Sequence, residues 1–132
     1  TTFEDLGINI LAAYNQDNGD TGAMGLSLGG GAFFTSMEDQ TLDALGTSGK
    51  AWVIGAGYSF EKVGIDGLTF GIAYGNFEAD DTSVYHASEI DAILEYQWDD
   101  KISATAAYSS IENKVAHFQD YSQLRIVANY NF

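Results

Sequence analysis

The chain has 132 residues, of which 5 are basic and 19 acidic, so its formal charge is −14 at pH 7. This length allows one domain, and the negative charge argues against a surface that binds nucleic-acid phosphates. Cysteine is absent, which excludes disulfides and thiolate metal sites, and no apolar run reaches the roughly 18 residues of a transmembrane helix. Proline is also absent. Because proline cannot donate a hydrogen bond to a sheet, its absence favours a chain committed to strands.

Apolar residues alternate with small or polar residues in six segments, and this period of two predicts six β-strands. In chain order we expect them at residues 6–14, 51–60, 68–74, 90–98, 102–108 and 124–132. In each segment one face is aliphatic and aromatic, without charges or amides, and the other is mostly small, polar or acidic. Periodicity alone allows the apolar face to contact either a protein core or lipid.

The connections between these strands alternate in length. Those at about 15–50, 78–88 and 110–121 are long, whereas 61–67 and 99–101 are short. Outer-membrane barrels show this alternation, with short turns on the periplasmic side and long loops outside. We therefore expect an antiparallel up-and-down sheet with both short turns at one end and the three long loops at the other.

Aromatic residues lie at both ends of the apolar face. The set beside the short turns and the C-terminus is Tyr58, Phe60, Tyr96, Trp98, Tyr130 and Phe132, and the opposite set is Trp52, Tyr14, Tyr74 and Tyr108. Two aromatic girdles that flank an aliphatic band are typical of strands that cross a bilayer. Phe132 is both the last position of the last expected strand and the last residue given.

Two segments resemble a known family of barrels. The ending RIVANYNF, residues 125–132, resembles the C-terminal strand of bacterial outer-membrane barrels, and residues 29–77 resemble the late part of OprD-like and campylobacter-type major outer membrane porins. The second match rests on Trp52, on Tyr74 and on the turn residues Val63, Gly64, Ile65, Gly67 and Leu68. Residues 91–132 resemble the closing strands of the same family.

The resemblance implies an all-β, antiparallel up-and-down transmembrane barrel in the outer membrane of a Gram-negative bacterium. Residues 1–132 would supply six C-terminal strands of a barrel of about 18. The implied function is a porin, a channel for passive diffusion of small hydrophilic solutes and ions, without catalysis. Lipid and lipopolysaccharide are the expected partners, nucleic acid is not, and a homotrimer is an open alternative.

The sequence given begins with Thr1 and shows neither an initiator Met nor the basic and apolar regions of a signal peptide. We therefore interpret Thr1 as a mature N-terminus or an internal cut. Six strands leave two open edges, and unpaired backbone groups in lipid cost several kcal/mol each. We therefore expect further strands of the same polypeptide to precede Thr1 and to pair with the edge that ends at Phe132.

No catalytic constellation is present. His86 and His117 lie in different expected loops without the spacing of metal ligands, and the glycines at 29–31 lack the GK[ST] of a phosphate loop. We expect neither an enzyme nor a cofactor. The acidic residues Glu78, Asp80 and Asp81 offer oxygen ligands for Ca²⁺, with a solvated loop as the alternative interpretation.

The long connection at 15–50 is the sharpest functional candidate, because structureless loops of this length are usually functional. Its Thr35-Ser36-Met37-Glu38 resembles a capping box, which predicts a short helix over 38–45 ended by Gly46. If the helix folds into the channel, Glu38, Asp39 and Asp43 line a constriction. The alternative is that the loop only covers the outer surface.

Four charged residues of the expected strands project to the polar face: Glu89, Asp91, Glu95 and Arg125. Carboxylates beside water on a low-dielectric wall raise the local concentration of cations, so the sequence predicts a cation-preferring pore. The alternative is solvated charges paired across strands. Two rival functions stay open, a structural or adhesive outer-membrane barrel and a soluble β-sandwich that binds a ligand.

Overall fold

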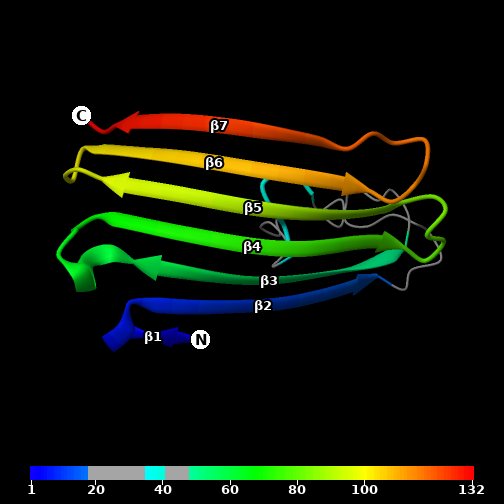
Figure 1. The fold of residues 1–132 in the computed structure, drawn as a ribbon, viewed down its shortest axis with the longest axis horizontal. Coiled ribbons are helices and arrows are strands. Elements are labelled where there is room, and N and C mark those ends of the chain that lie inside the picture. Colours follow the sequence, from blue (N-terminus) through cyan, green and yellow to red (C-terminus); the bar gives the residue numbers. More distant parts are fainter. Residues whose placement is uncertain (18–34, 41–47) are drawn as a thin grey trace.

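The computed structural model describes residues 1–17, 35–40 and 48–132, and within them the chain forms one antiparallel sheet (Figure 1). Its strands are β1 (Thr2–Phe3), β2 (Ile8–Asp17), β3 (Gly49–Ser59), β4 (Leu68–Ala79), β5 (His86–Gln97), β6 (Ile102–Asn113) and β7 (Tyr121–Tyr130). Each strand pairs with its neighbours in chain order, from β1 to β7. The expected all-β, antiparallel up-and-down arrangement is therefore confirmed.

The strand count was wrong by one, because the described residues hold seven strands instead of six. The additional strand, β1, pairs Thr2 with Asn9 and Phe3 with Ile8. Leu6, which we expected to begin a strand, lies in the 3-10 turn η1 (Glu4–Leu6) between β1 and β2. A strand of two residues is too short to show an alternation, so the hydropathy pattern could not reveal it.

The connections sort by length as predicted. Residues 60–67, which include the 3-10 turn η3 (Phe60–Val63), and residues 98–101 lie at one end of the sheet, together with η1. The connections between β2 and β3, β4 and β5, and β6 and β7 lie at the other end. Both 3-10 turns end at a glycine in the left-handed conformation, Gly7 with φ 66° and Gly64 with φ 87°, which other residues rarely adopt.

All six predicted strands extend further toward the long connections than predicted, and three of them do so by four or five residues. β4 continues to Ala79, β5 already begins at His86 and β6 continues to Asn113. In these extensions the positions that continue the apolar face are polar, such as Asn76, Ser88 and Ser110. The backbone ladder continues where the hydropathy alternation stops, so the pattern placed the strand ends too early.

At the opposite end, strands stop slightly earlier than predicted. β3 ends at Ser59, β5 at Gln97 and β7 at Tyr130, so the aromatic residues Phe60, Trp98 and Phe132 follow strand ends instead of closing them. Pairing nevertheless continues past two of these ends, because Trp98 N donates to Ile102 O at 3.0 Å and Asn131 N donates to Lys101 O at 2.9 Å.

The strand register places the predicted apolar positions on one side of the sheet, here called the apolar face. One row across six strands joins Ile10, Ala56, Ile72, Ala92, Tyr108 and Leu124. Because side chains alternate along a strand, the positions between them form the other side, here called the polar face.

Burial in this sheet is the reverse of that in a soluble sheet. On the apolar face large side chains are exposed, including Ile54 at 53% and Ile126 at 72%. The buried cluster, Ala51, Val53 and Phe77, lies instead on the polar face, where Met37, Ala73 and Tyr85 pack against it. The core therefore lies between the polar face and the segment 35–40.

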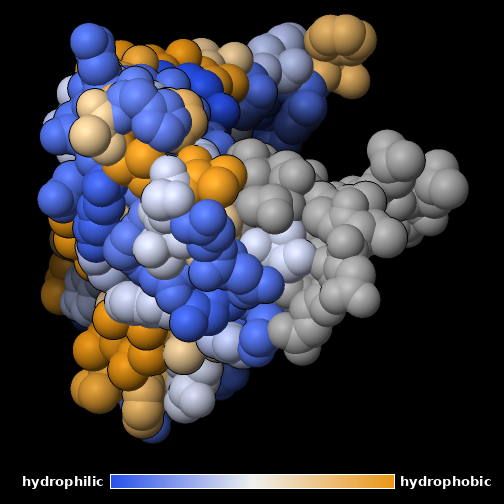
Figure 2. All heavy atoms as spheres, turned by 90° about the vertical axis from the view of Figure 1, so that its right-hand side faces the viewer, coloured by the Kyte–Doolittle hydropathy of each residue, from blue (hydrophilic) through white to orange (hydrophobic). Residues whose placement is uncertain are grey.

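The end of the sheet with the long connections is hydrophilic over most of its described surface, with hydrophobic residues toward the margins (Figure 2). No helix among residues 1–17, 35–40 and 48–132 is both long and apolar enough to cross a membrane.

Candidate functional site

The segment 35–40, which belongs to the long connection between β2 and β3, lies against the polar face (cyan in Figure 1). Three consecutive backbone N–H groups hold it there. The amide N of Glu38 lies 3.0 Å from Asp91 Oδ2, that of Asp39 lies 3.0 Å from Glu89 Oε1, and that of Gln40 lies 2.7 Å from Glu89 Oε2. This part of the loop thus lies over the polar face.

Glu89 and Asp91 converge on the segment because they are two residues apart on β5 and so share one face. Glu89 is fully buried and Asp91 is 3% exposed. Burial of carboxylates is costly unless hydrogen bonds compensate, and the three amides provide them. The second oxygen of Asp91, Oδ1, has no hydrogen-bond partner among the described residues.

The side chains of the segment reach other elements. Glu38 forms an ion pair with Arg125 on β7, and Asp39 accepts hydrogen bonds from Tyr121 and, at 3.3 Å, from Gln123 Nε2 on the same strand. Six residues of loop thereby connect β5 with β7.

Tyr85, which precedes β5, donates its hydroxyl proton to the side-chain oxygen of Gln40. Burial, and then the negative charge of Asp39, raise the pKa of Tyr85 above its ordinary value. The phenol therefore keeps its proton at neutral pH and remains a donor to the segment.

Met37 packs where β4 carries a glycine. A side chain at Gly75 would overlap the Met37 sulfur atom, and it would also approach Phe77 and Val53. The absence of a side chain at Gly75 is therefore what allows the segment to lie close to the sheet.

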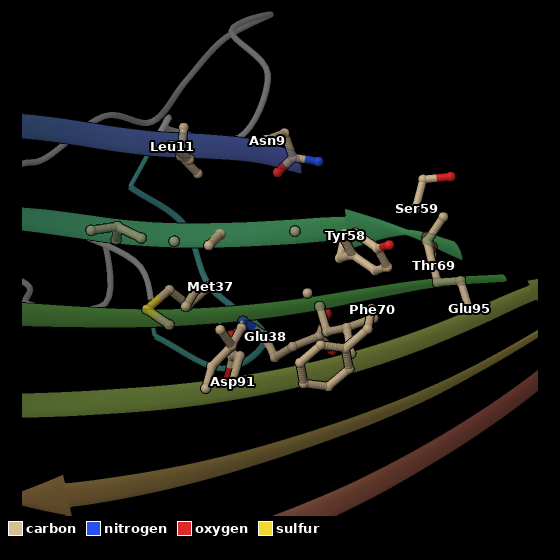
Figure 3. A pocket seen from close by; sticks show the side chains of 18 of the residues that line it. Asn9, Leu11, Met37, Glu38, Tyr58, Ser59, Thr69, Phe70, Asp91 and Glu95 are labelled. Atoms are coloured by element: carbon tan, nitrogen blue, oxygen red, sulfur yellow. Dashed lines mark hydrogen bonds between the residues drawn. The ribbon is translucent and has the colours of Figure 1, made fainter. Parts of the chain in front are cut away.

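Beside the segment, the polar face is hollowed into a cavity of about 560 Å³ (Figure 3). Its lining combines Ser36, Met37 and Glu38 of the segment with strand residues that include Gly55, Gly57 and Gly71. Asp91 lies near Met37 and Glu38, while Glu95 lies near Thr69 on the far side of the cavity (Figure 3). Glycines in the floor leave the open space, and carboxylates give it a negative lining.

The structure brings together most of the predicted pore-lining residues. Glu38 forms an ion pair with Arg125, and Asp39 accepts a hydrogen bond from Gln123. Asp91 accepts a hydrogen bond from the backbone of the segment. Glu89 projects to the polar face as expected, but its carboxylate is covered by the segment. Glu95 is exposed, and it accepts a hydrogen bond of 3.5 Å from Thr69 Oγ1. Asp43 lies outside the described residues.

The expected helix over 38–45 is not present in its described part. Residues 38 and 39 form a bend, and residues 41–47 lie outside the described residues. The capping box is not formed, because the Glu38 side chain binds Arg125 and the hydroxyl of the buried Thr35 has no partner among the described residues. Tertiary contacts with β5 and β7 override the local helix signal.

Eight of the ten aromatic girdle residues lie in pairs on the apolar face. Ring centroids are 4.9 Å apart for Tyr58 and Phe60, 5.9 Å for Tyr96 and Trp98, and 6.3 Å for Tyr130 and Phe132. At the opposite end, Trp52 and Tyr74 are 5.4 Å apart.

Two of the three residues considered for Ca²⁺, Glu78 and Asp81, have side-chain partners in the protein. Glu78 forms an ion pair of 2.8 Å with Lys50, and two hydrogen bonds from Ser83 lower the pKa of Asp81. In the part of the chain that the structure describes, no group of three or more His, Cys, Asp or Glu side chains is placed to hold a metal ion. His86 lies 3.1 Å from Asn76, and the His117 ring packs on Phe118.

Sequence reasoning did not identify Tyr121, Gln123, Tyr85 and Gln40 as parts of the site. Tyr121, Gln123 and Arg125 occupy every second position of β7. The period of two could therefore have placed all three on the same face. No sequence signal links Tyr85 to Gln40, because a loop-to-loop contact has no periodicity.

Comparisons of the chain with protein-family models, with curated proteins and with solved structures find no match.

Proposed function

We propose that the chain is the C-terminal part of an outer-membrane porin, related to the OprD-like porins, through which small hydrophilic solutes diffuse with a preference for cations. The apolar face contacts lipid in this proposal, and the polar face lines a water-filled channel. The segment 35–40 narrows that channel.

The observation that carries the proposal is the exposure of the apolar face. More than a dozen large side chains of this face are at least 38% exposed: Ile10, Tyr14, Ile54, Phe70, Ile72, Ile90, Leu94, Tyr96, Trp98, Ile102, Tyr108, Leu124, Ile126 and Tyr130. Half-burying such a side chain is worth about 1 kcal/mol. The sum approaches the entire net stability of a domain, about 5–15 kcal/mol, so this face requires a cover.

Lipid is the cover that fits the dimensions of the face. Along β5 and the residue that follows it, the apolar face runs over nine residues from Ile90 to Trp98, and a tilted strand needs about 9–11 residues to cross a bilayer. Outer-membrane barrels carry an apolar band about 25 Å tall with aromatic girdles at both borders. Beyond Trp52 and Tyr74, toward the long connections, the same face becomes polar and carries the ion pair of Lys50 and Glu78.

The edges of the sheet support a larger barrel. β2 is paired on one side by only the two residues of β1, and β7 is the last strand of the sheet. Lipid offers no hydrogen bonds to an open edge, so further strands of the same polypeptide are required to close it. The closed barrel would contact lipid and lipopolysaccharide, with a homotrimer as one possible assembly.

The charges of the polar face support cation preference. Glu38, Asp39, Glu89, Asp91 and Glu95 provide five carboxylates there, against the guanidinium of Arg125. A water-filled passage with this excess of negative charge concentrates cations.

Reconstitution of the intact polypeptide into liposomes tests the proposal. We expect small sugars to enter and swell the liposomes, and a reversal potential in a salt gradient to indicate cation preference. Membrane insertion without swelling would favour a structural or adhesive barrel. A polypeptide that stays in buffer without detergent would favour the soluble β-sandwich.

A further inference from the structure

We infer that Glu89, assisted by Asp91, is a positioning residue that fixes the segment 35–40 across the polar face and thereby sets the width of the passage. This inference rests on the proposed function for its consequence in the channel. Its structural core, the attachment of the segment to β5, does not depend on transport.

The contacts of Glu89 are those of an anchor. Both of its carboxylate oxygens are occupied by consecutive backbone amides, those of Asp39 and Gln40, and the residue has no exposed surface. A solute in the passage therefore cannot contact this carboxylate while the segment is in place. Asp91 holds the preceding amide, that of Glu38.

Attachment through the main chain leaves the side chains of the segment free for other contacts. Glu38 and Asp39 reach β7, and Gln40 reaches Tyr85. The contact with β7 is exposed, since the Arg125 side chain is 59% accessible to solvent. Exposed ion pairs contribute little, whereas buried, charge-assisted hydrogen bonds contribute more, so the attachment to β5 dominates.

Glu95 provides the matched comparison. It lies on the same strand and the same face as Glu89, but it is exposed and its hydrogen-bond partner is Thr69 on β4. Either substitution removes one carboxyl group from the polar face. Only the removal of Glu89 also deletes two anchoring hydrogen bonds of the segment.

The experiment compares Glu89→Ala and Glu89→Gln with Glu95→Gln in the intact, refolded polypeptide in detergent. Hydrogen exchange of the Asp39 and Gln40 amides is the primary readout. We expect exchange to accelerate at least about tenfold in Glu89→Ala, the factor that corresponds to one lost charge-assisted hydrogen bond. Glu89→Gln keeps the shape and one acceptor oxygen, so we expect a smaller acceleration. Glu95→Gln should exchange like the wild type.

Channel recordings give the second readout. Glu89→Ala should raise both the conductance and its fluctuations, whereas Glu95→Gln should reduce cation preference without added fluctuations. Equal exchange at Asp39 and Gln40 in Glu89→Ala and the wild type would overturn the inference, and so would faster exchange in Glu95→Gln than in both Glu89 variants. Accelerated exchange in a polypeptide that forms no channel would support the anchor while it refutes the proposed porin function. If Glu89→Ala does not fold, as judged by far-UV circular dichroism, Glu89→Gln decides.

Discussion

The two faces of this sheet use the same strands but differ in what they contact. On the apolar face, Ile72 and Ile126 are 50% and 72% exposed. On the polar face, Phe77 and Glu89 are fully buried beneath or beside the segment 35–40. Charged residues are thus buried and isoleucines are exposed in one sheet. The difference teaches that hydropathy alternation reports the two environments of a strand, but not which of them is the protein interior.

The largest expected effect is a difference in the stability cost of truncating a phenylalanine on each face. Phe77→Ala should destabilise the protein by about 3–5 kcal/mol, because the ring is buried against Met37, Ala51 and Val53 and leaves a void. Phe70→Ala on the apolar face should cost about 1.5–3 kcal/mol, because in the proposed barrel lipid fills the space and only the transfer free energy of the ring is lost. Denaturant titration in lipid vesicles measures both values. A Phe70→Ala cost that equals or exceeds that of Phe77→Ala would contradict this comparison.

A smaller effect concerns adjacent residues on β7. Ile126 lies on the apolar face, and Val127, which is paired with Thr105, lies on the polar face. Ile126→Arg should cost about 2–4 kcal/mol, the penalty for a charge near the bilayer midplane, whereas Val127→Arg should cost less than about 1 kcal/mol. Denaturant titration in lipid vesicles measures the loss of stability in both variants. Equal costs for the two substitutions would indicate that the faces do not differ in solvent.

The smallest effect concerns selectivity within the polar face. Glu95→Gln should lower the preference for cations, and Arg125→Gln should raise it, because each removes one charge of opposite sign from the passage. Reversal potentials in a salt gradient measure both. Both shifts should shrink as the salt approaches 1 M, where the Debye length is about 3 Å. Shifts of the same sign in both variants would exclude surface charge as the cause.

The sequence patterns predicted the sheet better than its boundaries. The alternation placed Ile72 and Tyr108 on one face and Asp91 and Arg125 on the other, and the register confirms this division. Strand ends were wrong where the apolar face becomes polar, as at Asn76 and Ser88, since hydrogen bonding between backbones does not require apolar side chains. The two-residue strand β1 was not predictable from periodicity.

The candidate site was only partly predictable. The alternation of side chains along β5 and β7 places Glu89, Asp91 and Arg125 on the polar face. The covering of Glu89 depends instead on the backbone path of residues 38–40. The local pattern at Thr35–Glu38 favoured a helix, and the contacts with distant strands produced a bend. Contacts across roughly fifty residues of chain have no local signature, so Gly75 also had no apparent role until Met37 was placed above it.

Cysteine labelling tests the central claim, that one face meets lipid and the other meets water, most directly. Residues 1–132 contain no cysteine, and any cysteine elsewhere in the intact polypeptide is replaced by serine before single cysteines are introduced. In liposomes that contain the intact polypeptide, we expect a membrane-impermeant thiol reagent to label Glu95→Cys and Thr105→Cys on the polar face. It should leave Ile72→Cys and Ile126→Cys on the apolar face unlabelled until the protein is denatured. Rapid labelling of the apolar-face positions, at the same rate as the polar-face positions, would contradict the account.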